Sequence, residues 1–372
     1  MGPSSDGREG AVTGPVPQPP AVPGAGAATG LGTAMTLVRN LLRPRAPGTG
    51  APGELPRGVP FAVRGEGGAT IWGRVMGAGG PLVVLAHGWT NDARVWSRVA
   101  HLLVAGGHRV VAYDQRGHGS SSAGVAGLTL PALAGDLAAV LAHVDACDAV
   151  VAGHSMGGMA VQALAAEAPD VLRARVRSVA LVSTACDGLA RFGTPADALV
   201  ARAMCRAAGS PWTTRALASA VAGPWLVRSA VGDDPDRDDL RAVAAMFAAT
   251  PAPVRRHLLA AMHAMDLSAA LGSLELPVLV VSGSRDALTP PARSRRVAGL
   301  LPCSHLVTLD GRGHMLPLEA PGMLAGLLAG LARGLAPQAA AAAARRGDAA
   351  GVRSRRDGRG TARSDGSPVG VA

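Results

Sequence analysis

Residues 149–158 read Ala-Val-Val-Ala-Gly-His-Ser-Met-Gly-Gly. The apolar run 149–152 predicts a buried strand, and the residues from 156 to about 166 predict a helix. A G-x-S-x-G motif between a strand and a helix is typical of a tight turn that presents a serine at the end of the strand. Gly153 and Gly157 fit that turn, because side chains two residues either side of Ser155 would clash. In so glycine-rich a chain the motif arises by chance in about one case in three, so its context has to support it.

The surrounding chain alternates between apolar strand-like runs and helical segments. Strands are predicted at 61–64, 70–75, 82–86, 109–113, 149–152, 176–182, 278–281 and 306–309. Helices are predicted at about 92–105, 130–144, 156–166, 291–301 and 316–335. Most of the runs are continuously apolar, as in strands buried on both faces. We therefore predict an α/β fold with a mostly parallel twisted sheet, helices on both faces and an antiparallel hairpin at one edge formed by the first two strands.

Residues 187–276 interrupt this alternation, since they contain no convincing strand and several helix breaks. This insertion between two strands holds four of the nine aromatic residues and four methionines, which favours a helical cap over an apolar cleft. A purely structural insertion is the alternative. The predicted domains are 59–186 and 277–336 as the core and 187–276 as the cap. Residues 1–58 are predicted to be a disordered Pro/Gly/Ala-rich segment, with a short helix or linker near 30–42, and 337–372 a disordered basic tail.

Two further motifs accompany the serine motif at residues 153–157. The strand-like run 82–86 leads into His87-Gly88-Trp89, and residues 114–120 read Asp-Gln-Arg-Gly-His-Gly-Ser. Together with the serine motif they resemble the α/β-hydrolase superfamily over about residues 59–335. The resemblance implies that the backbone N–H groups of Trp89 and Met156 form an oxyanion hole, and that His154 belongs to the nucleophile elbow. It also implies structural roles for His87 and for most of the 114–120 segment, although substrate binding by Asp114 or Arg116 stays open.

A serine nucleophile needs a base, and the base needs an orienting carboxylate. The family order is serine, acid, histidine. Asp286 follows the predicted strand 278–281, and His314 follows 306–309 in a glycine-flanked loop. By resemblance these two residues complete a triad with Ser155. Asp187, after the strand 176–182, is the rival acid because some members of the fold place it there.

The expected activity is that of a serine esterase acting on an ester, thioester or lactone of small to medium apolar character. Perhydrolase or haloperoxidase-like chemistry, acyl transfer and ligand binding without catalysis are the alternatives. Metalloprotease, P-loop and dinucleotide-binding motifs are absent from the sequence, so we expect no cofactor and no metal. A serine at the elbow, where an aspartate would stand, argues against epoxide hydrolases and dehalogenases.

Charge and cysteine content indicate which partners and which cellular compartment to expect. The net charge is +10 over 372 residues, all basic side chains apart from histidine are arginines, and residues 337–372 alone contribute +4. We attribute the arginine excess to GC-rich coding rather than to specific nucleic-acid binding, with tail-mediated binding of nucleic acid or anionic lipid as the alternative. Four cysteines without a zinc or disulfide pattern suggest buried thiols in a reducing compartment. With no apolar run of 18 residues and no signal-peptide pattern, we expect a cytoplasmic protein without a transmembrane segment; the oligomeric state stays open.

Overall fold

The computed structural model describes residues 53–125, 127–188 and 195–345, with the backbone alone at residues 66 and 195–198. The stretch 30–42 and the residues after 345 lie outside these ranges. Eight strands form one sheet in the order β1-β2-β4-β3-β5-β6-β7-β8. The strands are β1 (Gly58–Arg64), β2 (Thr70–Met76), β3 (Leu82–Ala86), β4 (Arg109–Tyr113), β5 (Ala149–His154), β6 (Val176–Val182), β7 (Val278–Gly283) and β8 (Ser304–Leu309).

The edge hairpin and the parallel body of the sheet confirm the predicted fold class. β1 and β2 pair antiparallel, and β2 joins β4 antiparallel, whereas β4, β3, β5, β6, β7 and β8 are parallel. Within the hairpin Phe61 lies opposite Gly73, where a Cβ would lie 2.4 Å from the phenyl ring. The glycine therefore makes room for the ring at this point of the sheet.

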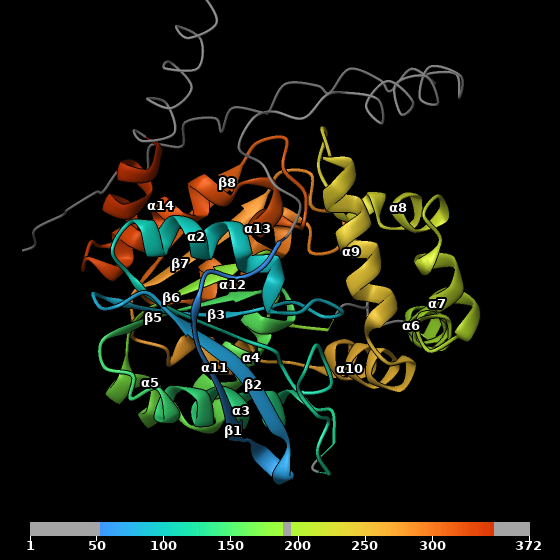
Figure 1. Cartoon of the computed structure of the whole chain (residues 1–372), viewed down its shortest axis with the longest axis horizontal. Helices are drawn as coiled ribbons and strands as arrows, with labels where there is room; N and C mark the ends of the chain where they lie inside the picture. The colour runs from blue at the N-terminus through green and yellow to red at the C-terminus, as the bar shows by residue number, and fades with distance from the viewer. Residues whose placement is uncertain (1–52, 126, 189–194, 346–372) are drawn as a thin grey trace, which may run out of the picture. The chain divides into compact units, whose positions relative to one another are not determined.

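Two helical layers cover the sheet (Figure 1). Alternate strand residues point into two separate cores, because successive side chains of a strand face opposite sides. One core includes Val84 and Val151 with helices α3 and α4, and the other includes Val83 and Val150 with helices α2 and α14. The layer helices are η2 (Ala93–Trp96), α2 (Ser97–Ala105), α3 (Leu130–His143), α4 (Met156–Glu167), α5 (Pro169–Arg175), α12 (Pro291–Leu300), α13 (Leu316–Glu319) and α14 (Pro321–Ala332).

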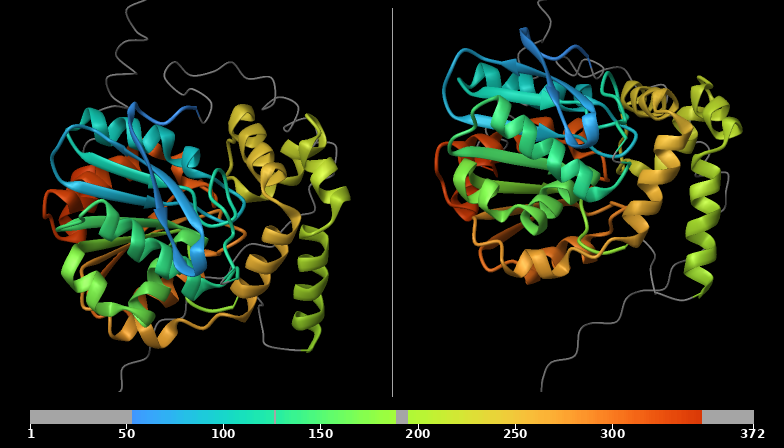
Figure 2. Two further views of the ribbon diagram at one scale, coloured as in Figure 1. Left: turned by 60° about the horizontal axis from the view of Figure 1, so that its bottom comes forward. Right: turned by 90° about the horizontal axis from the view of Figure 1, so that it is seen from below.

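Between β6 and β7 the described chain is helical and lies beside the sheet (Figures 1 and 2). We call residues 187–276 the insert. Its helices are α6 (Pro195–Ala208), α7 (Pro211–Ala218), α8 (Ala222–Leu226), η3 (Arg228–Ala230), α9 (Arg237–Ala249), α10 (Ala252–Ala264) and α11 (Ser268–Gly272). Three of the breaks expected from the sequence, at 209–211, 232–235 and 251–253, lie at or just before helix starts: Ser210 and Asp236 accept hydrogen bonds as N-caps of α7 and α9, and Pro251 precedes α10. The break expected at 223–224 is wrong, because both residues lie inside α8.

The C-terminal tail was predicted to begin at residue 337, and this boundary is wrong because a helix follows. Residues 337–345 are helical, and Ala340, Ala341 and Ala344 are buried. This helix packs on α14 at glycines: a Cβ at Gly330 would lie 2.8 Å from the Cβ of Ala340. Small residues on both helices permit an approach that composition alone does not reveal. The helix expected at 316–335 is also divided, because Pro321 starts α14 after α13 has ended.

The expectation of four buried cysteines is wrong for two of them. Cys186 is buried and Cys205 partly buried, but Cys147 and Cys303 are exposed, and all four are free thiols. Cys147 lies in the turn between α3 and β5, and Cys303 directly precedes β8. Both lie in connections, which run over the surface of a domain.

Candidate active site

Ser155 lies in a strained turn between β5 and α4. Its φ of 52° and ψ of −117° place it outside the regions that non-glycine residues favour. Such strain costs about 1–3 kcal/mol and persists only where the surroundings enforce it. Here the Ser155 N–H donates to the carbonyl of Val182, and the Thr184 hydroxyl donates to the carbonyl of Ser155, each over 2.8 Å. Both bonds anchor the turn to the end of β6.

The two glycines of the motif are sterically required. A Cβ at Gly153 would lie 2.5 Å from backbone atoms of Gly157 and Gly158. A Cβ at Gly157 would lie 2.4 Å from the carbonyl oxygen of Ala86. Real Cβ atoms essentially never approach backbone this closely, so either side chain would force the turn apart. The tight turn therefore requires glycine at both positions, as the sequence predicts.

The structure brings Asp286 and His314 together. Asp286 follows β7 and His314 follows β8, and the Nδ1 atom of His314 lies 2.9 Å from Oδ2 of Asp286. Both side chains are buried. The carboxylate also accepts hydrogen bonds from the backbone N–H of Leu288 and from the N–H and hydroxyl of Thr289. β5, β7 and β8 are parallel strands of one sheet, so the loops that follow them meet at one edge.

Asp286 is held in its charged form. Burial acts to raise its pKa, but the electrostatic interaction with the His314 ring and the hydrogen bonds from His314 and Thr289 outweigh burial, and the pKa falls below its usual value. A carboxylate can only accept, so the proton between the pair belongs on Nδ1 of His314. The Nε2 atom is then left as an acceptor, which is the tautomer a general base requires.

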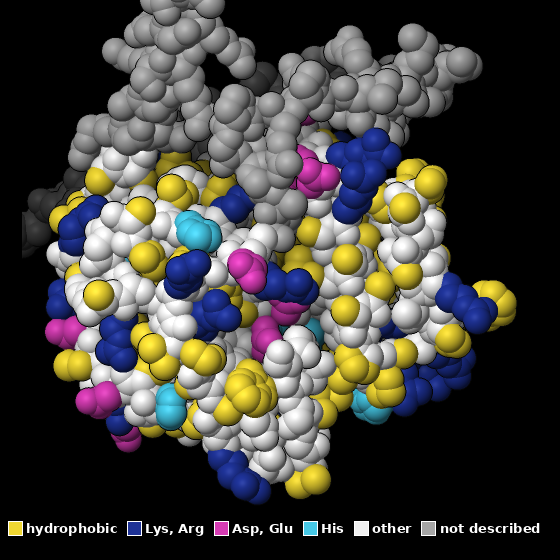
Figure 3. All heavy atoms as spheres, viewed as in Figure 1, with side chains coloured by type: hydrophobic (Ala, Val, Ile, Leu, Met, Phe, Trp, Pro, Cys, Tyr) yellow, Lys and Arg dark blue, Asp and Glu magenta, His cyan; other side chains and the backbone are white. Residues whose placement is uncertain are grey.

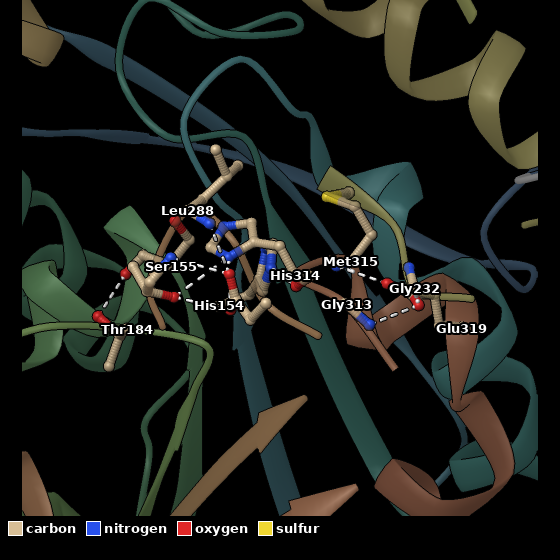
Figure 4. A network of polar contacts seen from close by, with 11 residues as sticks. His154, Ser155, Thr184, Gly232, Leu288, Gly313, His314, Met315 and Glu319 are labelled. Carbon is tan, nitrogen blue, oxygen red and sulfur yellow. Dashed lines mark hydrogen bonds and ion pairs between the residues drawn. The ribbon is translucent and has the colours of Figure 1, made fainter. Parts of the chain in front are cut away.

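The side chain of His154 contacts the backbone of the loop that carries His314. Its Nε2 lies 2.9 Å from the backbone carbonyl oxygen of His314, and the two imidazole centroids are 5.0 Å apart. Figure 4 shows Ser155, His154 and His314 side by side. Burial lowers the pKa of His154 to about 3, so its ring is neutral and donates through Nε2–H. His154 therefore positions the backbone of His314 through this hydrogen bond.

The turn His87-Gly88-Trp89 packs against the elbow. A Cβ at Gly88 would lie 2.9 Å from Nδ1 of His154 and 3.2 Å from the Cβ of Ser155. The same turn touches α4, which begins at Met156, through Gly157. The loop that carries Trp89 and the helix start that carries the Met156 amide thus lie against each other beside the serine.

His87 has the structural role expected of it. Its Nε2 accepts from the N–H of Gln115 over 2.9 Å, and its Nδ1 lies 2.8 Å from the carbonyl oxygen of Gly88. Burial lowers its pKa to about 4, so it is neutral. The contact with Gln115 ties the turn after β3 to the turn after β4.

The 114–120 segment is also engaged in structural contacts. The carboxylate of Asp114 accepts from the N–H groups of Ala93 and Ser120. Arg116 forms a buried ion pair with Asp136, at 2.6 Å between Nε and Oδ2. These contacts agree with a structural role for both residues.

The rival acid is engaged elsewhere. Asp187 pairs with Arg293 over 2.7 Å and with Arg296 over 3.1 Å, both on α12. These ion pairs fix the start of the insert to the core. Asp286, not Asp187, is the carboxylate that contacts His314.

Glu319 was not singled out by the sequence, yet it holds the loop around His314 (Figure 4). Its Oε2 accepts from the N–H groups of Gly313 and Gly232, and its Oε1 accepts from that of Met315, at 2.8–2.9 Å. The N–H of His314 itself donates to the carbonyl of Ala230. Burial raises the pKa of Glu319, and the three N–H groups oppose that shift. The only local signal is an acid five residues after the histidine, which is too common to interpret alone.

The insert reaches the turn that carries Trp89. The indole ring meets the ring of Phe247 on α9 edge to face, with centroids 5.2 Å apart, and its Nε1–H donates to the carbonyl of Arg255 on α10 over 3.2 Å. Val254 lies against Gly117 in the loop after β4. Helices α9 and α10 of the insert therefore lie against the loops that follow β3 and β4.

A profile of the alpha/beta hydrolase fold family matches residues 81–321. The chain belongs to the α/β-hydrolase fold family. It is 32% identical over 255 residues to the dihydrolipoyllysine-residue acetyltransferase component of an acetoin cleaving system from Pseudomonas putida, covering 67% of this chain and 62% of that protein. The chain thus spans less than two thirds of that relative.

Two other similar proteins are matched over nearly their whole length. The chain is 31% identical to a pimeloyl-[acyl-carrier protein] methyl ester esterase from Aeromonas hydrophila, covering 63% of this chain and 89% of the esterase. The structure of an enol-lactonase from Burkholderia xenovorans matches with a TM-score of 0.59 and 26% identity, covering 71% of this chain and 96% of the lactonase. The expected membership of the superfamily is confirmed, and the relatives include hydrolases.

Within residues 53–125, 127–188 and 195–345, no group of three or more His, Cys, Asp or Glu side chains could hold a metal ion. None of the helices in the described part of the chain combines the length and hydropathy needed to cross a bilayer.

Proposed function

We propose that the protein is a serine hydrolase that cleaves an ester, thioester or lactone of small to medium apolar character through an acyl-enzyme on Ser155. The observation that carries the proposal is the arrangement of three groups at one sheet edge. Ser155 is held in a strained, glycine-walled turn, and beside it His314 contacts the ionised carboxylate of Asp286. A nucleophile, a base and an orienter on the ends of separate strands are what acyl transfer requires.

In the proposed reaction Nε2 of His314 takes the proton of the Ser155 hydroxyl while the serine oxygen attacks the acyl carbon. Asp286 keeps the imidazole in the Nδ1–H tautomer and stabilises the imidazolium. When the tetrahedral intermediate collapses, His314 gives the proton to the departing alcohol or thiol. A water molecule activated by the same histidine then releases the acid and restores Ser155.

The backbone N–H groups of Trp89 and Met156 are the proposed oxyanion donors. Met156 is the first residue of α4, so its N–H belongs to the positive end of a helix. The turn of Trp89 packs on that helix start through Gly157. One such donor typically contributes about 10²–10³ in rate.

We propose further that the insert acts as a cap over the acyl group. Phe247 presses on the ring of Trp89, and Leu288, two residues after Asp286, exposes an apolar side chain near the triad. Apolar groups around a few polar ones are typical of small-molecule sites. The names of the relatives, a methyl ester esterase and an enol-lactonase among them, support ester-type substrates.

The test is hydrolysis of p-nitrophenyl esters of increasing acyl length by the wild type, Ser155→Ala and Ser273→Ala. We expect Ser155→Ala to lower kcat by at least about 10⁴-fold, because removing the nucleophile of a triad disables it as a unit. Ser273 is exposed at the end of α11, so its variant should retain wild-type rates. Equal activity of wild type and Ser155→Ala on every ester would contradict the proposal, and the preferred acyl length would measure the space beneath the insert.

A further inference from the structure

Exposed apolar side chains gather on one part of the insert. Thirteen large hydrophobic residues are exposed in the described chain, and seven of them lie between 199 and 226. These seven are Leu199, Val200, Met204, Trp212, Val221, Trp225 and Leu226. Isolated exposed apolar residues need no explanation, but a concentration of them marks an interaction surface. We call the exposed side of α6, α7 and α8 the outer face.

The most exposed members are large. Trp212 is 73% exposed, Trp225 70% and Val221 83%. The aromatic and methionine content of the insert favoured a cap over a cleft, but these two tryptophans face solvent. In Figures 1 and 2, α9 and α10 lie between the sheet and α6–α8, so the outer face points away from the sheet.

The exposed charges described on this face are positive. Between residues 199 and 232 the sequence contains four arginines and no aspartate or glutamate, while Asp197, at the start of α6, has a side chain outside the described ones. Arg202, Arg206 and Arg215 are exposed, and the guanidinium of Arg215 lies 5.4 Å from the ring centre of Trp212. Figure 3 shows hydrophobic and arginine side chains together along the right-hand edge, over α6–α8. The insert as a whole is not basic, because its nine arginines are matched by nine acids, five of them at 233–239, after η3.

We propose that the outer face binds the surface of a bilayer that contains anionic lipids. Tryptophan favours the boundary between headgroups and acyl chains, because its ring is apolar while its N–H stays hydrated. Arginine extends an apolar stem and leaves its charge among the phosphates. Short helices that present aromatic and aliphatic residues with basic ones match an interfacial, non-spanning mode of binding.

A bilayer fits this face better than a second copy of the chain. A self-complementary interface would bring the three exposed arginines of one copy, Arg202, Arg206 and Arg215, against those of the other, and the sequence between residues 199 and 232 offers no acid to compensate them. An anionic surface meets these three charges with the opposite sign, and each arginine near such a surface adds to binding. This inference does not depend on the chemistry at Ser155, which lies on the inner side of the insert.

Sedimentation of the full chain with vesicles tests the proposal. The vesicles would contain phosphatidylcholine alone or with 30% phosphatidylglycerol, at low and moderate salt. The variants are Trp212→Ser/Trp225→Ser on the outer face and Trp72→Ser, a matched exposed tryptophan on β2. A third variant, Arg202→Glu/Arg206→Glu, reverses charge on α6. Hydrolysis of a soluble ester and the melting temperature report on folding.

We expect the anionic vesicles to bind the wild type at least about tenfold more tightly than the neutral ones, with binding weakened by salt. Both outer-face variants should bind at least about tenfold more weakly, and Trp72→Ser should bind like the wild type. The proposal would be overturned if the wild type did not bind vesicles, or if the wild type formed a dimer that the tryptophan variant abolished. Unchanged vesicle binding by both outer-face variants would also overturn it, and would point instead to the arginine-rich residues 346–372.

Discussion

The edge of the sheet that carries Ser155 and the insert beside it are built differently. At the sheet edge each loop is fixed by specific partners: the Ser155 carbonyl by Thr184, the flanks of His314 by Glu319, and the Asp286 carboxylate by three donors besides His314. The insert is held by packing of short helices, and several of its large apolar side chains remain exposed. The loops at the sheet edge are therefore fixed by directed hydrogen bonds, whereas packing between short helices adds to the contacts that hold the insert.

Two buried arginines differ in the groups that compensate their charge. Arg116, in the loop after β4, pairs with the carboxylate of Asp136. Arg255, in the insert, donates to the carbonyls of Ala208, Phe247 and Thr250 and to the hydroxyl of Thr214. Ala208 and Phe247 belong to the last turns of α6 and α9, whose carbonyls favour a positive charge. Arg255 thereby joins helices of the insert into one unit without a charged partner from the core.

The largest expected effect separates the two candidate acids. Asp286→Asn should lower kcat by about 10⁴-fold, because an amide favours the wrong tautomer of His314. Asp187→Asn, the same change at the start of the insert, should alter kcat by less than about threefold, because Asp187 pairs with Arg293 and Arg296. Steady-state kinetics on one ester measure both. A larger loss in Asp187→Asn than in Asp286→Asn would reverse the assignment.

A Cβ added to the elbow should have the next largest effect. Gly157→Ala places a methyl group against the carbonyls of Ala86 and His87, so kcat/KM should fall at least about 100-fold through displacement of the turn. Gly272→Ala, in the insert, meets nothing within 4 Å and should leave activity unchanged. Wild-type activity of a folded Gly157→Ala would show that the turn adapts more easily than its contacts indicate.

Glu319 joins the two regions, and its substitution should act mainly on kcat. Glutamine offers one acceptor oxygen where the carboxylate serves three N–H groups, so at least one donor would face an amide NH₂. We expect Glu319→Gln to lower kcat about tenfold with KM changed less than twofold. Glu275→Gln, at an exposed acid of the insert, is the control. An effect confined to the melting temperature would limit Glu319 to a structural role.

The stability of the folded chain should also decrease in acid, because three buried histidines near the sheet edge are held neutral. Burial lowers the pKa of His118 and His154 to about 3 and that of His87 to about 4. The unfolded chain therefore binds more protons between about pH 6.5 and 4, so the free energy of unfolding should fall as the pH falls through that window. Each such histidine contributes about 1.4 kcal/mol per pH unit.

His118→Gln should reduce that slope by about one proton, measured by denaturant unfolding at pH 7, 6, 5 and 4.5. His257→Gln, at an exposed histidine on α10, should keep the wild-type slope. Equal slopes in all three proteins would show that His118 does not stay neutral in the folded state.

The core was predictable because its signals are local. Continuous apolar runs gave six of the eight strand starts, and the glycines around Ser155 gave the elbow. Asp286 and His314 followed from their places after strands, once the resemblance supplied the order. Glu319 and the positioning role of His154 were not predictable, because each acts on backbone atoms of a loop that only the folded chain brings near. The insert was predicted as helical, but which faces of its short helices point outward depends on tertiary packing.

The proposed function depends on Ser155 acting as a nucleophile activated by His314. Reaction with a fluorophosphonate ester, followed by peptide mass spectrometry to locate the adduct, tests both residues at once. We expect one phosphonylated residue, Ser155, with no adduct in Ser155→Ala and labelling at least about 100-fold slower in His314→Ala. An adduct on another serine, or a folded wild type that does not react, would contradict it.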